Sequence, residues 1–248
     1  MMYRVFTAAL LAASSVSALT ISSTCQAALT GVATNSDANA CLSASSLLSV
    51  VLQSNASIIT PVDNWLKSLC SAAPCSNATL SAVVTNITTG CSAELSSSPD
   101  SSASTLIPLV EQYYTTARKI VCLADSGTNC ITQTLTNIQS ILGTLSISNI
   151  GDVITKAATT TSLPTNITCT DCLKQAYNVL NTDFPSTASS LTSELDSECG
   201  ASFTDGTTPA DIKSTTSDNG KNSAMTLTRG TFVGSVLVVA SSLWAFLA

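Results

Sequence analysis

Ten cysteines constrain the fold of this 248-residue chain more than any other feature of its sequence. They are Cys25, Cys41, Cys70, Cys75, Cys91, Cys122, Cys130, Cys169, Cys172 and Cys199. An even cysteine count in an exported chain is typical of a disulfide framework. The stretch SSSPDSSAS (residues 96–104) is the most linker-like part of the interior, and it leaves five cysteines on each side. Because an odd number cannot pair completely on one side, full pairing requires at least one disulfide across this stretch. We therefore predict one covalently closed domain.

The first residues have the pattern of a secretory signal peptide. Arg4 is followed by an apolar run from Val5 to Ala13 and then by the small-x-small end Val16-Ser-Ala18. The run is far shorter than the ~20 residues of a membrane-spanning helix. A positive start, a short apolar core and a small-residue end are typical of a cleaved signal. We predict a signal peptide over residues 1–18, with a buried N-terminal helix as the alternative.

The other end of the sequence has the pattern of a glycosylphosphatidylinositol (GPI) attachment signal. An uncharged apolar run extends from Phe232 to Ala248, with no Lys or Arg after it. Small residues at 222–224 and a short polar spacer precede this run, as in chains that receive a GPI anchor. We predict attachment at Asn222 and removal of residues 223–248, with Asn219 or Gly220 as other attachment sites. A membrane-spanning helix is the alternative, since the run is at the lower limit of spanning length.

The charge balance argues against several classes of partner. The chain carries 9 basic and 15 acidic residues. Arg4 and Arg229 lie in the segments predicted to be removed, so the mature protein is more acidic than the whole chain. Such a surface does not suit nucleic acid, whose phosphates need Lys and Arg, or anionic lipid.

Four Asn-x-Ser/Thr sequons predict N-linked glycans, at Asn55, Asn77, Asn86 and Asn166.

The spacing of apolar residues predicts an all-α fold, a helical bundle stapled by disulfides over residues 19–203. We expect helices at residues 47–54, 61–70, 76–90, 106–123, 131–142 and 147–158, and one that begins near Thr168 and ends before Pro185. Ser76 is expected to cap its helix, and Pro108 to lie in a first turn. Residues 204–222 are rich in Ser, Thr, Asp, Asn and Gly, which predicts a flexible stalk that leads to the anchor.

Few residues in the sequence suit catalysis or cofactor binding. Histidine is absent, which removes the commonest general base and the usual zinc ligand. Acidic residues gather near the C-terminal end of the predicted domain, at Asp171, Asp183, Glu194, Asp196 and Glu198. A glycan-active enzyme would need two of them facing each other, but such acids are more typical of a solvated helix face. We therefore expect no catalytic residue, cofactor or metal.

Cys169-Thr-Asp-Cys172 is a C-x-x-C motif, which is found in redox pairs, in zinc sites and at ordinary disulfide anchors. A thioredoxin-like redox pair needs a βαβ surround, which this region lacks, and a zinc site needs a second close pair or histidines. Two cysteines in the first turn of a helix that Thr168 caps could join that helix to two neighbours. We predict structural disulfides to other helices, and not a bond between Cys169 and Cys172.

Three segments of the chain resemble a known family. They are YYTTARKIVCLADSGTNCITQTLTNIQ, LPTNITCTDCLKQAYNVLNTDFP and ECGASFTDGT. They look like a family of secreted, cysteine-rich, GPI-anchored proteins of basidiomycete fungi, whose domain has no assigned function. The resemblance covers roughly residues 70–205. It implies a fungal cell-surface address and transfer onto cell-wall glucan through the anchor remnant, and it implies no catalytic residues.

Together these patterns predict a protein on the outer face of the plasma membrane or in the cell wall, with a structural or interaction role. A second hypothesis is an extracellular module that binds a small apolar ligand, a sterol or a fatty acid, inside its helical bundle. A carboxylate-dependent glycan-active enzyme is the third.

Overall fold

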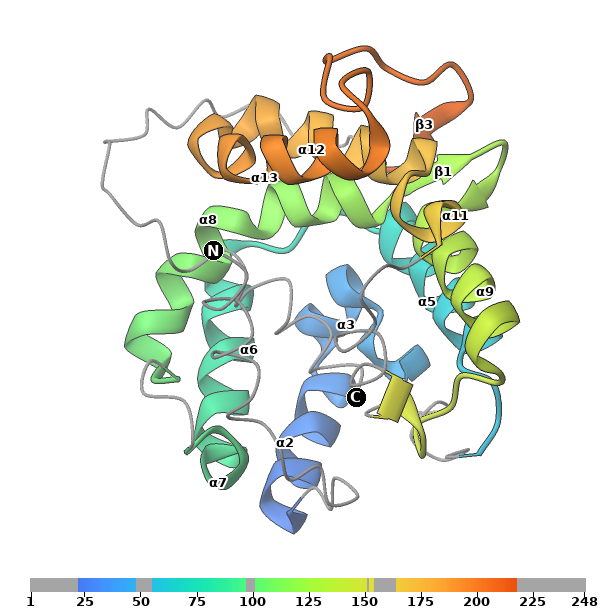
Figure 1. Cartoon of the computed structure of the whole chain (residues 1–248). Helices are drawn as coiled ribbons and strands as arrows, with labels where there is room; N and C mark the ends of the chain where they lie inside the picture. Colours follow the sequence, from blue (N-terminus) through green and yellow to red (C-terminus); the bar gives the residue numbers. More distant parts are fainter. Residues whose placement is uncertain (1–21, 48–54, 97–100, 151, 154–163, 218–248) are drawn as a thin grey trace.

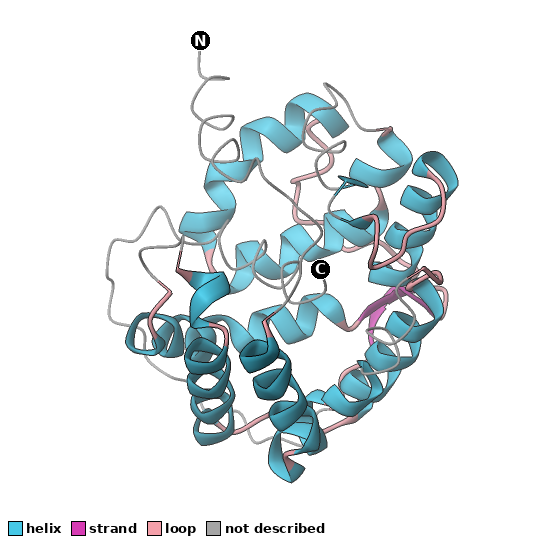
Figure 2. Cartoon of the chain, turned by 90° about the horizontal axis from the view of Figure 1, so that it is seen from below, coloured by secondary structure: helices cyan, strands magenta, loops and turns pink. Residues whose placement is uncertain are grey.

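Helices make up most of the chain that the structure describes (Figures 1 and 2). The computed structural model describes residues 22–47, 55–96, 101–150, 152–153 and 164–217. Its helices are α2 (Ser23–Thr34), α3 (Ser36–Leu42), the 3₁₀ helix η2 (Ala44–Leu47), α5 (Ile59–Ser71), α6 (Asn77–Gly90), α7 (Ser92–Leu95), α8 (Ala103–Val121), α9 (Cys130–Leu142), α11 (Thr165–Thr168), α12 (Asp171–Asp183) and α13 (Pro185–Cys199). The predicted helical fold is confirmed. Of the helices expected at residues 47–54 and 147–158, the structure describes only residue 47 and residues 147–150 and 152–153.

Local signals explain where several helices begin. The Ser76 hydroxyl accepts a hydrogen bond from the Thr79 amide, so this serine caps α6 as predicted. Asn129 caps α9 in the same way, through its side-chain oxygen and the Ile131 amide. Thr and Val are weak helix formers, so packing between helices has to supply much of the stability.

The longest helix, α8, begins earlier than expected. It starts at Ala103, inside the stretch predicted to be a linker, so Pro108 lies in the second turn and not in the first. Proline lacks an amide hydrogen and leaves one carbonyl of the preceding turn without its helical partner. In Figure 1 α8 (green) crosses the middle of the molecule, with α6 on one side and the α12–α13 pair on the other. Because α8 contacts both α6 and α12, it connects the helices before the linker-like stretch with those after it.

The interior consists of several small apolar clusters. The largest lies between α5, α9 and the segment that follows α9, and it contains Ile58, Val62, Leu66, Leu69, Leu135, Leu145, Ile150 and Val153. A second surrounds the cysteines Cys41 and Cys75 together with Leu80. A third lies beside a small sheet and contains Leu123, Cys130, Cys172 and Ile212. Because small cores bury little apolar surface, covalent bridges are well placed to hold them together.

A three-stranded sheet was not predicted. Strand β1 (Leu123–Asp125) lies between β2 (Thr128–Asn129) and β3 (Ile212–Ser214), and both pairings are antiparallel. A two-residue turn joins β1 to β2, and Ser126 and Gly127 both have positive φ, as a tight hairpin requires. Figure 2 shows the strands (magenta) as a small patch at one side of the helical body.

The prediction of a flexible stalk from residue 204 is wrong for residues 204–217. Phe203 and Ile212 are buried, and β3 pairs with β1. Hydrogen bonds from Thr207 and then from Lys174 lower the pKa of the Asp205 carboxyl to about 2. The apolar side chains and strand pairing anchor this polar segment, which composition alone could not reveal. Residues 218–222 lie outside the described part.

No helix in the described part of the chain is both long enough and apolar enough to cross a bilayer. The predicted signal peptide (residues 1–18), the attachment site Asn222 and the tail (residues 223–248) all lie outside the described residues.

Candidate functional site

All ten cysteines are paired in the structure. The disulfides are Cys25–Cys91, Cys41–Cys75, Cys70–Cys122, Cys130–Cys172 and Cys169–Cys199. No cysteine is free, and all ten belong to the described residues. Of the five bonds, Cys70–Cys122 alone connects the residues before the predicted linker with those after it. The expected bridge across the linker is therefore confirmed.

The C-x-x-C motif is a pair of structural anchors. Cys172, in the first turn of α12, is bonded to Cys130 at the start of α9, and Cys169 is bonded to Cys199 at the end of α13. The predicted partners on other helices are thus confirmed. The predicted cap is wrong by two residues, because the Thr170 side chain accepts from the Leu173 amide and Cys169 precedes the helix.

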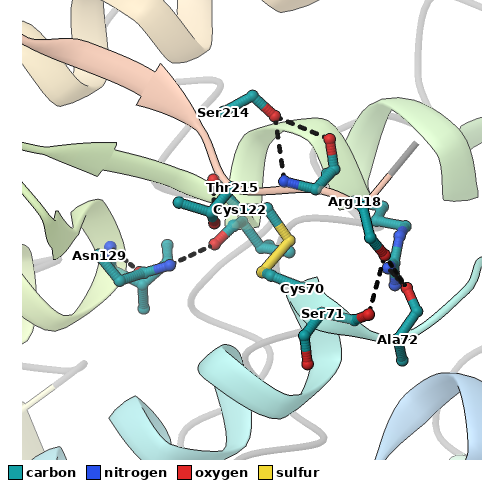
Figure 3. The surroundings of a disulfide bond; sticks show 12 residues. Cys70, Ser71, Ala72, Arg118, Cys122, Asn129, Ser214 and Thr215 are labelled. Carbon is teal, nitrogen blue, oxygen red and sulfur yellow. Dashed lines mark hydrogen bonds between the residues drawn. A yellow bond between two sulfur atoms is a disulfide. The ribbon is translucent and has the colours of Figure 1, made fainter.

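The bridge across the linker is covered by the C-terminal described segment (Figure 3). Cys122 is fully buried, and its carbonyl accepts hydrogen bonds from the Thr215 amide (2.9 Å) and the Thr215 hydroxyl (2.8 Å). The Ser217 amide donates to the Cys70 carbonyl at 3.0 Å. Residues 212–217 thus form a strap across the Cys70–Cys122 disulfide. The expectation of a flexible stalk overlooked this role.

Arg118 is a buried cation that the apolar pattern of α8 did not reveal. It is 6% exposed, and its Nη2 donates to the carbonyl of Ala72, at the C-terminal end of α5 (Figure 3). The Ser217 hydroxyl lies 2.9 Å from the same carbonyl. A cation at a helix C-terminus interacts favourably with the helix dipole and with unpaired carbonyls. Nη1 has no hydrogen-bond partner in the described structure.

One cluster has the residue types of a metal site but not the chemistry. Ligand atoms of Cys25, Cys91 and Glu94 lie within 4.8 Å of one another. The two sulfurs are bonded to each other and cannot act as thiolates. Glu94 accepts a hydrogen bond of 2.6 Å from the Ser22 amide, which lowers the pKa of the carboxyl. This carboxylate therefore holds the start of the domain in place.

The five acidic residues singled out in the sequence are divided among separate environments. Burial disfavours the charged form of Asp183, but hydrogen bonds from Lys119 and Thr116 outweigh it and lower the pKa of this carboxyl. Asp196 accepts a hydrogen bond from Thr204, and Asp171 is exposed in the first turn of α12. Glu194 and Glu198 lie four residues apart on α13, beside an apolar groove.

This groove runs between α12 and α13 and has Ile120 of α8 beside them. We call it the α12–α13 groove. Its volume is about 290 Å³, and it is lined by Ile120, Leu173, Ala176, Tyr177, Leu180, Leu191, Glu194, Leu195 and Glu198. On α12, Cys172 and Tyr177 are buried. Leu173 is 37% exposed and lines the groove instead.

The four sequon asparagines, Asn55, Asn77, Asn86 and Asn166, are all exposed. An oligosaccharide can be accommodated only on an accessible side chain, so the surface would admit a glycan at each position. None of these asparagines lies on α8, α12 or α13.

No protein-family model matches this chain, and neither does any curated protein or solved structure.

Proposed function

We propose that this chain is a fungal GPI-anchored glycoprotein, displayed on the outer face of the plasma membrane or in the cell wall, with a structural or interaction role. The membrane contact is through the anchor at Asn222, and cell-wall glucan is a further attachment partner. Nucleic acid is not a partner, and no catalytic residue, cofactor or metal is proposed.

Complete disulfide pairing is the observation that carries this proposal. Five bonds join short helices whose apolar clusters are small. Such frameworks form and persist in oxidising compartments, and they are typical of secreted and surface domains. The exposed sequons and the patterns at both ends of the sequence also support export to the cell surface.

Mass spectrometry of the mature native protein tests the proposal. We expect an N-terminus near Leu19, a GPI remnant on or near Asn222, and hexose-containing glycans on at least two of the four sequons. Phosphatidylinositol-specific phospholipase C should release the protein from membranes. An intact tail peptide on protein that the phospholipase does not release would overturn the anchor.

A second candidate is a carrier of a small apolar ligand, and the α12–α13 groove is the observation in its favour. The groove is open to solvent and bordered by two carboxylates, which repel the head group of a fatty acid, so a neutral sterol fits it better. Organic extraction of the native protein, followed by lipid mass spectrometry, would detect such a ligand.

A further inference from the structure

The α12–α13 groove presents apolar side chains from two neighbouring helices. The Cys169–Cys199 bond joins the residues just before α12 to the end of α13, so the two helices are antiparallel neighbours. The α12 side contributes Leu173, Ala176 and Leu180, at helical spacing, and the α13 side contributes Leu191 and Leu195. Rows of side chains at this spacing form ridges between which a third helix packs. The apolar floor from Leu173 to Leu180 is about two helical turns long.

The charge at the groove is negative and unbalanced. Two lysines lie next to lining residues in the sequence, but Lys119 is paired with Asp183 and Lys174 with Asp205. Neither the Glu194 nor the Glu198 carboxylate forms an ion pair within the described residues. Like charges four residues apart on a helix are mildly destabilising. The groove therefore offers apolar surface with two carboxylates that lack a cation.

We propose that the α12–α13 groove is the docking site for a basic amphipathic helix of a partner protein. Leucine-like side chains of that helix fill the groove, and its Lys or Arg side chains pair with Glu194 and Glu198. Helix-in-groove recognition of this kind uses apolar anchors at i, i+3, i+4 and i+7. None of the four sequons lies on α8, α12 or α13, the helices that line the groove. The inference deepens the interaction role proposed above, and it depends on display of the domain outside the cell.

A designed peptide tests the docking site. The full-length gene is expressed through a secretory pathway, and the mature protein is placed in zwitterionic phospholipid nanodiscs, with empty nanodiscs as the blank. The probe is a fluorescein-labelled helical peptide of ~15 residues, with a leucine stripe flanked by lysines. Fluorescence anisotropy should show saturable binding that added NaCl weakens. The same peptide with glutamate in place of lysine should not bind.

Two matched sets of variants separate this site from general attraction between opposite charges. Glu194→Gln with Glu198→Gln should weaken binding by about three- to tenfold, since each exposed ion pair contributes little. Glu111→Gln with Asp152→Asn removes the same charge elsewhere and should leave the affinity unchanged. Leu173→Gln, at an already exposed side chain, should also weaken binding while the thermal unfolding midpoint stays close to that of the original protein.

Several results would overturn the docking site. One is the absence of saturable binding to the original protein, and another is equal affinity for both pairs of charge variants. A lipid that co-purifies in the groove would identify a different occupant, as would a dimer that Leu173→Gln dissociates in sedimentation experiments. Failure of the peptide to bind would leave the anchor and the glycans intact in mass spectrometry, so the two proposals fail separately.

Discussion

Arg118 and Gly90 are single residues on which contacts between helices depend. Arg118 belongs to α8 but caps the C-terminal end of α5, so it links the two parts of the chain beside the Cys70–Cys122 bond. Gly90 lies where α6 crosses α2, and a Cβ atom there would be 2.3 Å from the Cβ of Ala28. Each residue therefore contributes to stability mainly through its contact with a neighbouring helix.

Replacing Arg118 with Met should destabilise the domain by about 2 kcal/mol, because the charged hydrogen bond from this buried side chain to the Ala72 carbonyl is lost. Urea denaturation of the oxidised protein measures this. Arg118→Lys keeps the charge at the helix end and should recover part of the loss. Equal stability of Arg118→Met and the original protein would show that the cap contributes nothing.

Gly90→Ala should destabilise the domain by about 1–3 kcal/mol, since overlap with Ala28 forces α2 and α6 apart. Gly31→Ala is the matched control on the facing helix. Its added Cβ would lie 3.5 Å from Asn86 Nδ2, an ordinary contact. Because Ala favours helix over Gly by up to about 1 kcal/mol, this control should be neutral or stabilising in the same denaturation experiment. Destabilisation of equal size in both would contradict the crossing as described.

Contacts between elements fix the C-terminal part of the domain. Asp183, at the end of α12, accepts hydrogen bonds from Thr116 and Lys119 of α8. The strap of residues 212–217 adds β3 to the sheet and covers the bridge across the linker. Hydrogen bonds contribute to both connections, and the buried side chain of Ile212 adds to the second.

The Asp183 contact should make stability depend on pH. The pKa of this carboxyl lies below its ordinary value of 3.8, so its contribution is fully present above that pH and is lost as the pH falls through the lower, folded-state pKa. Asp183→Asn should cost about 1 kcal/mol at neutral pH, and the difference should shrink below pH 3.8. Thermal unfolding at a series of pH values measures it. Asp152→Asn, at an exposed side chain, should show no such trend.

The strap should protect the disulfide that it covers. Ile212→Ala removes a buried side chain and should cost about 2 kcal/mol. The Cys70–Cys122 bond should then be reduced faster by dithiothreitol, as followed by alkylation and mass spectrometry. Lys213→Ala changes an exposed residue of the same strand and should leave the rate unaltered. An unchanged rate in Ile212→Ala would mean that the strap does not shield the bond.

At the scale of the whole molecule, five disulfides and several small clusters replace a single large core. Four of the bonds join cysteines on the same side of the linker, and Cys70–Cys122 joins the two sides. α8 and this bond thus hold one domain together. Loss of the bond should affect the connection between the halves more than the structure of either half.

A protease site that replaces residues 99–100 tests whether Cys70–Cys122 is the only disulfide between the two sides of the linker. After cleavage, the original protein should remain one species on a non-reducing denaturing gel and separate into two on a reducing gel. With Cys70→Ser and Cys122→Ser, the cleaved chain should separate without reductant. The double variant should also lose about 2–4 kcal/mol of stability, mainly through a less constrained unfolded chain. A single non-reduced band from the cleaved double variant would contradict the disulfide map.

The sequence by itself determined the helical class, several helix ends and the necessity of a bridge across the linker. These features depend on local chemistry or on counting: Ser76 caps through the amide three residues ahead, and an odd number of cysteines cannot pair completely. The same reasoning excluded Cys169–Cys172 as a redox pair, because its surroundings lacked the required elements.

Only the tertiary structure decided which cysteines pair, where residues 204–217 lie and what Arg118 does. Ten cysteines permit many connectivities, and spacing along the chain does not say which helices become neighbours. β3 is too short and polar to be recognised before β1 is placed beside it, and the partner of Arg118 is the end of a helix 46 residues away in the sequence. The α12–α13 groove likewise exists only once two helices lie side by side. Such features depend on contacts between distant residues, which sequence patterns of a few turns do not encode.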